Sequence, residues 1–190
     1  MLELLSPAGS MEALRAAVQN GANAVYLGVG NLNARQSAKN FTPQTLVDAV
    51  KYCHVRGVDV HLTLNTLVSD REMKEAAELI RHAAQYNIDA FIVQDLGVVQ
   101  LCRQIAPHIP IHGSTQMTVH SLPGVQLCAA MGMKRVVLSR ELSREEIRYI
   151  CANSPIEIEV FAHGALCMSY SGQCYLSAAI GGRSGNRGRC

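Results

Sequence analysis

The stretch VDVHLTLNTLVSDREMKEAAELIRHAAQYNIDAFIVQD, residues 58–95, contains the pattern that decides the fold. Two short apolar runs, residues 58–64 and 90–93, have the length of buried strands, and the segment between them has the length and composition of a helix. Ser69 and Glu72 form a candidate capping box, because a serine at a helix start and a glutamate three residues later can satisfy each other's backbone amides. The stretch therefore predicts a strand–helix–strand unit.

The same alternation of strand and helix runs along the whole chain. Helix starts are predicted at Ser10, at Thr42 followed by Pro43, and at a second capping box that begins at Ser143. The expected strands are residues 2–6, 24–28, 58–64, 90–93, 109–115, 135–138 and 156–161. Seven strands separated by six helices predict a parallel sheet with right-handed crossovers.

Two architectures accommodate this order, an open doubly wound sheet and a (β/α)8 TIM-like barrel. The barrel is favoured because the units are evenly spaced and several strands carry polar residues at alternate positions, whereas parallel strands covered on both faces are usually apolar throughout. A complete barrel takes about 250 residues, and this chain has 190. We therefore expect a single incomplete barrel domain over residues 1–190, with an eighth strand beyond Cys190. The open side would expose apolar surface unless a second copy of the chain or a local rearrangement covers it.

Composition and charge narrow the class of protein. Hydrophobic residues make up 48% of the chain and charged residues 17%, which argues against disorder. No apolar run approaches the ~20 residues that cross a bilayer, and the first residues lack the basic region and cleavage site of a signal peptide. We expect a cytoplasmic protein without membrane association, whose seven cysteines do not form disulfides.

The cysteines fall into two groups. Four lie singly within expected helices, among apolar neighbours, and are expected to pack as small hydrophobic side chains: Cys53, Cys102, Cys128 and Cys151. Cys167, Cys174 and Cys190 follow the last strand, in the loop of residues 164–190, among glycine, serine and arginine. Soft thiolates select zinc, copper or iron–sulfur. Their wide spacing fits structural zinc poorly and a cluster better, with one ligand unassigned.

Polar residues gather where the expected strands end, which is where barrel enzymes place their active sites. Asn65 and Gln116 can each donate and accept hydrogen bonds, which suits reading a nucleobase or a carboxylate. The long polar loop of residues 31–41 is expected to bind substrate or to act as a lid. The candidate catalytic residues are Gln116, Glu159 and His163, and the candidate substrate-binding residues are Arg35, Asn65, Asp95, Arg140, Arg183 and Arg187.

The seventh strand is expected to turn Glu157, Glu159, Phe161 and His163 toward the barrel interior. An acid there has a raised pKa unless a cation pairs with it, and Arg140 on the neighbouring strand is the expected partner of Glu159. Glu157 is interpreted as a member of a structural ion pair. Two further strand histidines, His61 and His112, are expected to be hydrogen-bonded core residues.

Three arginines, Arg183, Arg187 and Arg189, fall in the last eight residues of the chain with no acid nearby. Such a basic segment beside a site could meet phosphate. The alternative interpretation is that these arginines only keep a glycine-rich tail soluble.

The run from Glu159 to Ser177, EVFAHGALCMSYSGQCYLS, resembles position by position the signature of the collagenase-like peptidase family U-32. Shorter blocks that resemble the family are residues 5–9, 24–28, 33–41, 63–65, 94–97, 114–116 and 138–142. The resemblance implies a (β/α) barrel as the N-terminal domain. It also implies a four-iron four-sulfur (4Fe-4S) cluster held by four cysteines, of which Cys167, Cys174 and Cys190 match three and the fourth lies beyond this chain.

The resemblance implies three possible activities. Relatives of this kind hydroxylate a pyrimidine in tRNA or ribosomal RNA, with prephenate as the oxygen donor; others take part in ubiquinone hydroxylation, and older assignments are collagenases. The sequence contains neither His-Glu-x-x-His nor Gly-x-Ser-x-Gly, which disfavours two common classes of hydrolase. A peptidase using a cysteine with His163 stays open, as does a barrel that binds metal only for structure.

The leading hypothesis is an iron–sulfur RNA hydroxylase of which this chain is the catalytic barrel. In that hypothesis Glu159, His163 and Gln116 line the substrate pocket, and the three arginines near the end of the chain hold RNA phosphate.

Overall fold

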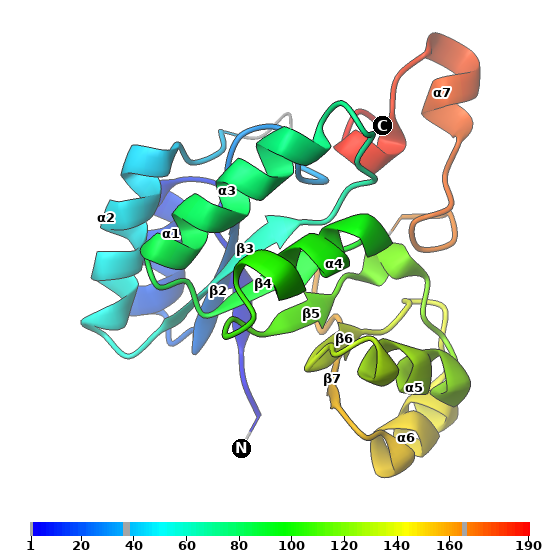
Figure 1. Cartoon of the computed structure of the whole chain (residues 1–190). Helices are drawn as coiled ribbons and strands as arrows, with labels where there is room; N and C mark the ends of the chain where they lie inside the picture. The colour runs from blue at the N-terminus through cyan, green and yellow to red at the C-terminus, as the bar shows by residue number, and fades with distance from the viewer. Residues whose placement is uncertain (1, 36–38, 165–166) are drawn as a thin grey trace.

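The computed structural model describes residues 2–35, 39–164 and 167–190. Its strands form one parallel sheet in the order β1 to β7, and helices cover the outer face of the curved sheet (Figure 1). The strands are β1 (Leu5–Pro7), β2 (Ala24–Gly28), β3 (Asp59–Leu64), β4 (Ala90–Val93), β5 (Ile111–Gly113), β6 (Arg135–Val137) and β7 (Glu157–Glu159). The architecture is an incomplete (β/α) barrel, which confirms the predicted fold class.

The helices lie between consecutive strands, and a last one follows β7. They are α1 (Met11–Gln19), α2 (Pro43–His54), α3 (Met73–Gln85), α4 (Leu96–Ile105), α5 (Leu122–Ala130), α6 (Arg144–Asn153) and α7 (Leu176–Gly181), with 3-10 turns η1 (Thr115–Met117) and η2 (Gly185–Arg187). Helix α7 projects from the rest of the molecule, and η2 returns to it (Figure 1). Within the described residues, no helix is long and apolar enough to span a membrane.

Three of the predicted helix starts are confirmed and one is wrong. Ser10 caps α1, Thr42 caps α2 and Ser143 forms a capping box with Glu146 at α6. Helix α3 begins only at Met73, without a side-chain cap. The glutamate of the expected box, Glu72, accepts hydrogen bonds from the backbone N–H and the hydroxyl of Ser69, and so closes a turn before the helix.

The predicted strands β2 and β4 have the observed bounds, whereas β5 and β7 are shorter than predicted. Beyond β5 the hydroxyl of Ser114 accepts from the backbone N–H of Gln116 and starts η1. Strand β7 ends at Glu159, and the two residues that were expected to continue it, Val160 and Phe161, are exposed.

The two faces of the sheet differ in polarity. Alternate strand residues such as Leu27, Leu62 and Phe91 face the helices and join the hydrophobic core. The inner face, which is turned away from the helices, carries polar side chains. Tyr26 is in register with His61, and further along the sheet His112 is in register with Arg135. This polar inner face is the property that distinguishes a barrel from a sheet covered on both sides by helices.

The two strand histidines are buried as expected, but the expectation that they are fully hydrogen-bonded is wrong. Their rings meet edge to face, with 4.9 Å between centroids. The Nδ1 atoms of His61 and His112 have no hydrogen-bond partner. Burial lowers the pKa of His61 to about 4 and that of His112 to about 3, so both rings are neutral at pH 7.

Candidate active site

The segment at the end of the chain returns to the mouth of the half-barrel. The side-chain amide of Asn186, in η2, donates to Gln94 Oε1 at the end of β4 over 2.7 Å. Its oxygen accepts from the backbone N–H of Leu67, just beyond β3, over 2.9 Å. One asparagine therefore fixes the last turn of the chain to the ends of two neighbouring strands.

Arg187 strengthens this attachment. Its guanidinium lies 2.9 Å from Glu72 and donates to the carbonyl oxygen of Leu67. Hydrogen bonds from Ser69, and then from Arg187, hold the pKa of Glu72 below its usual value. The guanidinium that we expected to bind substrate thus already has protein partners, and its role toward a substrate stays a prediction.

The tail also packs against the loop that follows β2. Gly188 has a φ of 71°, and a Cβ there would collide with the carbonyl oxygen of Ala34. Only glycine combines this backbone conformation with this close approach. Residues 184–188 therefore lie between the loops after β2 and β3, next to the mouth.

The cysteine-containing loop, residues 167–174 of the described chain, is anchored by Arg140 and Glu141 beyond β6. Arg140 donates to the hydroxyl of Ser171 through Nε and to the carbonyl oxygens of Cys167 and Ser169 through its terminal nitrogens, over 3.2 to 3.4 Å. Glu141 accepts from the backbone N–H of Ser171 over 2.8 Å and from its hydroxyl over 3.1 Å. Ser171 is only 1% exposed and is the centre of this attachment.

This finding corrects one expectation about Arg140. We expected it to pair with Glu159, but the cation beside Glu159 is Arg135 of β6, with 3.5 Å between Nη1 and Oε2. Strand β6 ends before Arg140, so this side chain leaves the barrel interior and reaches the loop.

The other side of the cysteine loop rests on the segment after β5. The hydroxyl of Thr118 donates to the carbonyl oxygen of Ser171 over 2.7 Å, and the side-chain amide of Gln173 donates back to that hydroxyl. Gly172 has a φ of 76°, and a Cβ there would collide with the carbonyl oxygen of Gln116. The backbone of Gln116, a predicted catalytic residue, therefore supports this loop, and its carbonyl also accepts from Gln94.

The three loop cysteines carry free thiols; Cys174 is half-buried and the other two are exposed. The position of a Cβ on Gly185 would lie 3.5 Å from the carbonyl oxygen of Cys174 and 3.9 Å from Cys190 Sγ, so these two residues border one space. Among residues 2–35, 39–164 and 167–190, no three His, Cys, Asp or Glu side chains are grouped to hold a metal ion. The thiols match a cluster in donor chemistry, and their arrangement does not form a finished ligand set.

The helix cysteines divide differently from the prediction. Cys53, Cys102 and Cys128 are buried, and burial raises the pKa of the first to about 11 and of the second to about 12, which makes their thiols poor nucleophiles. Cys151 is exposed on α6, so its assignment to the core is wrong.

A small cleft of about 30 Å³ lies at the mouth, beside the ends of β1, β2 and β3. Arg35 and Asn65, both predicted from the sequence to bind substrate, line it together with Tyr26. Asn65 accepts from the backbone N–H of Ala34, and buried Asn33 accepts from that of Arg35, so two asparagines shape the loop that carries the arginine. Of the predicted substrate loop, residues 36–38 lie outside the described part of the chain.

The acids of β7 have different environments. Glu157 forms the expected structural ion pair, with 2.8 Å between its Oε2 and Arg135 Nη2. Burial raises the pKa of Glu159, and the opposing effect of the nearby Arg135 offsets only part of this shift. His163 is exposed beyond the end of β7 and, within the described residues, forms no hydrogen bond to a cysteine. It therefore does not share the inward face with Glu159, as was expected.

Two further predicted residues have clear positions. Asp95 caps α4 by accepting from the N–H groups of Gly97 and Val98, and it also accepts from Val68, so its carboxylate stabilises the turn beyond β4. Arg183 is exposed after α7 and has no ion pair among the described residues. The sequence did not predict that Asn186 and Ser171 attach the end of the chain, or that Tyr26 lines the cleft. Only the position of Ser171 between two cysteines could have indicated its role.

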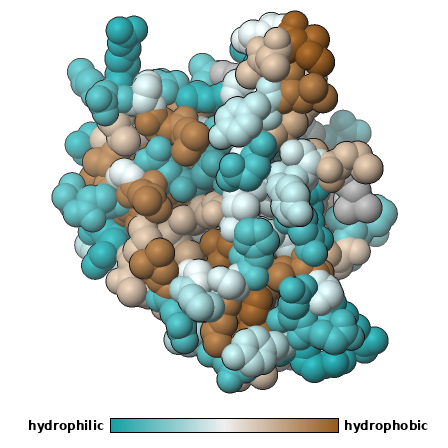
Figure 2. Space-filling model, turned by 90° about the vertical axis from the view of Figure 1, so that its right-hand side faces the viewer, coloured by the Kyte–Doolittle hydropathy of each residue, from teal (hydrophilic) through white to brown (hydrophobic). Residues whose placement is uncertain are grey.

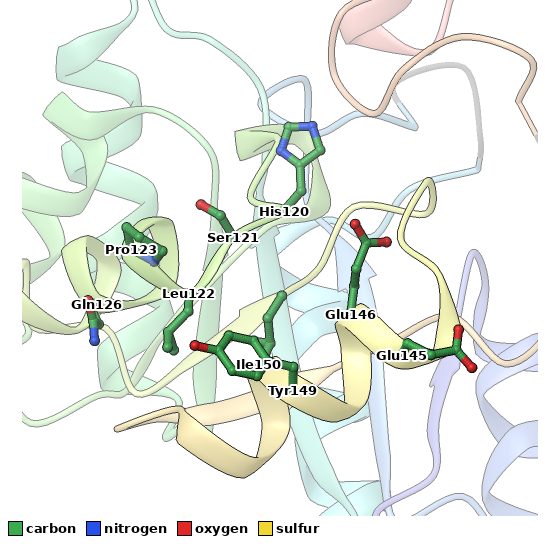
Figure 3. A pocket seen from close by; sticks show the side chains of 9 residues that line it. All are labelled: His120, Ser121, Leu122, Pro123, Gln126, Glu145, Glu146, Tyr149 and Ile150. Carbon is green, nitrogen blue, oxygen red and sulfur yellow. The ribbon is translucent and has the colours of Figure 1, made fainter.

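A larger groove of about 530 Å³ lies elsewhere, on the outside of the half-barrel between α5 and α6 (Figure 3). The side chains of Leu122, Tyr149 and Ile150 approach one another there. None of the predicted site residues lines this groove, whose polar lining residues are His120, Ser121, Gln126, Glu145 and Glu146. The mouth is therefore the candidate active site.

Comparison with known proteins gives a consistent set of relatives. The chain is 41% identical over 189 residues to the 23S rRNA 5-hydroxycytidine synthase of Escherichia coli, covering all of this chain and 28% of that protein. It is 42% identical to the tRNA hydroxylation protein P of Helicobacter pylori, covering all of this chain and 45% of that protein. A collagenase of Porphyromonas gingivalis is 36% identical, with 99% of this chain and 48% of that protein covered. The chain thus spans less than half the length of these relatives.

Solved structures agree on the fold. A U32 peptidase structure matches with a TM-score of 0.71 at 15% identity, covering 84% of this chain and 68% of the other. Thiamine phosphate pyrophosphorylase from Pyrococcus furiosus matches with a TM-score of 0.60 at 16% identity, covering 84% and 74%. The model of peptidase family U32 matches residues 9–190. The chain belongs to peptidase family U32.

Proposed function

We propose that this chain is the barrel portion of an enzyme that hydroxylates a pyrimidine base in tRNA or ribosomal RNA with the help of an iron–sulfur cluster. The proposal is supported by relatives at about 40% identity over the whole chain that are named for rRNA and tRNA hydroxylation. Because the chain covers less than half of each of these relatives, the activity is assigned to the barrel by its site and not by the names alone.

One observation carries the proposal: the cysteine-containing loop and the arginine-rich tail are both fixed to the C-terminal ends of the strands. Arg140 and Glu141 hold Ser171 beyond β6, and Asn186 joins the ends of β3 and β4. Barrel enzymes place substrate at this end of the sheet. The proposal puts the thiols beside the mouth, where a base taken out of an RNA strand would be bound.

The groups at the mouth suit such a substrate. Asn65 presents an amide, which can pair with the edge of a pyrimidine. Arg35 presents an exposed guanidinium next to it, which can bind a carboxylate or a phosphate. Prephenate, the oxygen donor that the family resemblance implies, has two carboxylates. We propose that one of them binds in the cleft, beside Arg35.

The cluster is proposed to be bound by Cys167, Cys174 and Cys190, with a fourth ligand outside this chain. When bound, it would supply electron transfer at the mouth. The residues of the chain bind and orient: Arg140 holds the backbone of Cys167, and Ser171 fixes the loop between the first two thiols. The raised pKa of Glu159 makes this carboxyl a candidate to accept or donate a proton below the mouth.

The rival function is proteolysis, for which two relatives, 40% and 36% identical to this chain, are named. A cysteine peptidase needs a thiol within hydrogen-bond reach of a base. Within the described residues, His163 forms no hydrogen bond to any of the three loop cysteines. The site geometry therefore favours hydroxylation.

The test is anaerobic reconstitution, with iron and sulfide, of a protein that contains this barrel together with the proposed fourth ligand, followed by incubation with tRNA, ribosomal RNA and prephenate. We expect an iron–sulfur absorbance in the visible range and a hydroxylated pyrimidine nucleoside, detected by mass spectrometry after RNA digestion. Cys174→Ser should lose both signals. Cys151→Ser, which removes an exposed thiol from α6, is the matched control and should keep both.

A wild-type spectrum and iron content in Cys174→Ser would exclude this thiol as a ligand. Cleavage of a collagen peptide by wild-type chain and by Cys174→Ser, without nucleoside hydroxylation by either, would instead support a peptidase that uses another group. An iron–sulfur spectrum without hydroxylation of RNA and without cleavage of collagen would support a barrel that binds metal only for structure.

A further inference from the structure

The chain beyond β7 has a composition unlike the rest of the molecule. After Glu159 there is no aspartate or glutamate up to Cys190, while three arginines are present. One of them, Arg187, is paired with Glu72. Arg183 and Arg189 are exposed and, within the described residues, have no carboxylate partner. A net positive, acid-free segment next to the mouth is therefore available to a negatively charged partner.

The same segment exposes large apolar and aromatic side chains. Tyr170 is 64% exposed, Tyr175 is 72% exposed and Met168 is completely exposed, and on α7 Leu176 and Ile180 are also exposed. Figure 2 shows the face on which α7 lies, with hydrophobic residues standing out at its top, where Figure 1 places that helix. Side chains of this size are rarely left uncovered in such number on one short segment unless they bind something.

The position of this segment relative to the mouth is fixed at two points. Ser171, next to Tyr170, is held by Glu141 and Arg140, and the backbone N–H of Gln173 donates to the carbonyl oxygen of Tyr170 in a turn. Asn186, between Arg183 and Arg189, is bound to the ends of β3 and β4. The two tyrosines flank Cys174, which itself borders the space beside Gly185. A strand that lies on this surface would therefore lead toward the mouth.

We propose that Tyr170, Tyr175, Arg183 and Arg189 form a binding surface for unpaired RNA, on which bases stack against the tyrosines and phosphates meet the arginines. Aromatic side chains between exposed arginines are the combination that proteins use for single strands, because every base has a π-face and every nucleotide has a phosphate. The same surface of a second copy would not supply the negative charge, since the segment after Glu159 contains three arginines and no acid. The inference rests on the proposed RNA substrate and adds the surface that would recognise it.

The experiment measures binding of a fluorescently labelled, unpaired 12-nucleotide RNA to the chain by fluorescence anisotropy. Tyr170→Ala and Tyr175→Ala should each weaken the affinity at least about fivefold, the lower end of what stacking of one base contributes. Tyr175→Phe keeps the ring and should retain the affinity. Tyr149→Ala on α6 removes a tyrosine that is 60% exposed, away from the proposed surface, and should change nothing.

The arginines are tested through salt dependence. Arg183→Gln and Arg189→Gln should each reduce the slope of the logarithm of affinity against the logarithm of salt concentration by about 0.7, the value for one phosphate contact on a single strand. Arg148→Gln, on exposed α6, should leave the slope unchanged. The same RNA annealed to its complement should bind more weakly, because paired bases cannot stack on the tyrosines.

Equal affinities for wild type, both alanine variants and the Tyr149 control would overturn the proposal, as would equal affinity for the duplex. A change in sedimentation of Tyr175→Ala without a change in RNA affinity would also overturn it, by assigning the surface to self-association. Binding is measured apart from chemistry, so the two proposals fail separately. Hydroxylated RNA with unaffected binding in the tyrosine variants would refute the surface alone, and tyrosine-dependent binding without hydroxylation would refute the activity alone.

Discussion

Glu3 and Arg135 form a bidentate ion pair across the N-terminal end of the half-barrel, with Nη1 and Nη2 of the arginine 2.6 and 2.9 Å from the two carboxylate oxygens. Glu3 precedes β1 and Arg135 begins β6, so the pair joins parts of the sheet that are 132 residues apart in the sequence. The same guanidinium contacts Glu157 and Glu159 of β7. A single cation thus ties one edge of the open sheet to the other edge.

Removing this cation should destabilise the chain more than removing an ordinary surface charge. Arg135→Gln leaves three carboxylates close together without a cation, at a side chain that is only 13% exposed. We expect a loss of about 2 kcal/mol in the free energy of unfolding, between the values typical of exposed and of buried pairs. Urea unfolding measures this loss, with Glu78→Gln, at an exposed position of α3, as the control. A loss no larger than that of the control would show that the cluster does not hold the two edges together.

The buried histidines predict a stability that falls in mild acid. His61 and His112 have pKa values lowered to about 4 and about 3 by burial, whereas an unfolded histidine titrates near 6.5. Between pH 6.5 and 5 the unfolded chain therefore binds protons that the folded chain does not. Each histidine should remove about 1.4 kcal/mol of unfolding free energy per pH unit in that range, and this contribution is fully regained above pH 6.5.

The measurement is urea unfolding between pH 5 and 7.5 for wild type, His112→Phe and His82→Gln. The first variant should flatten the pH dependence, whereas the second, which changes an exposed histidine of α3, should not. Glu159 titrates with the opposite sign, because its raised pKa gives stability that is lost as pH rises. The difference between variants, and not the wild-type slope alone, is therefore decisive. Parallel curves for wild type and His112→Phe would contradict the prediction.

Sequence patterns predicted the elements of this fold better than the contacts of its site. The bounds of β2 and β4 followed from apolar runs that must be buried on the helix side, and the cap at Ser143 from local hydrogen-bonding chemistry. At Ser69 the hydrogen bonds to Glu72 are formed, but they close a turn and helix α3 begins only at Met73. Glu72 also binds Arg187, 115 residues away, and a local motif cannot report a partner so distant in the chain.

The same limit applies to the site. Arg35 and Asn65 were found because residues after adjacent strands meet at one end of a barrel. The partner of Glu159 was not, because Arg140 was assigned to the neighbouring strand although the strand predicted there, residues 135–138, ends before it; the cation beside Glu159 is Arg135, at the start of β6. The attachment of the tail through Asn186 depends on a loop path that no periodicity describes.

Gly172 provides a test of how the cysteine loop is held. Gly172→Ala introduces a Cβ that meets the carbonyl oxygen of Gln116 and also requires a φ of 76°, which residues other than glycine rarely adopt. We expect the attached state of the loop to lose about 2 kcal/mol. The half-buried thiol of Cys174 should then react with an alkylating reagent roughly tenfold faster or more.

Gly182→Ala is the matched control for this variant. Its φ of 61° also favours glycine, but a Cβ there meets no atom within 4 Å. The control therefore contains the conformational cost without the collision, and the alkylation rate of Cys174 should stay near the wild-type rate. Equal acceleration in both variants would mean that the contact with Gln116 does not hold the loop.

Arg140 is predicted to position the cysteine loop for iron–sulfur binding. Its guanidinium supplies donors to the carbonyl oxygens of Cys167 and Ser169 and to the hydroxyl of Ser171, so Arg140→Gln leaves these acceptors without their donors. After anaerobic reconstitution we expect iron content and visible absorbance to fall by more than about half, a loss of about 1 kcal/mol or more in loop attachment. Arg144→Gln, at the exposed start of α6, should keep wild-type iron content.

A second measurement separates positioning from a general loss of stability. Arg140→Lys keeps the charge but cannot reach three acceptors with one ammonium group, so it should restore only part of the iron content. Both Arg140 variants should unfold in urea close to wild type, because the barrel core does not include this side chain. Full iron content in Arg140→Gln would contradict the positioning role, since its removal would then leave the cysteines correctly placed.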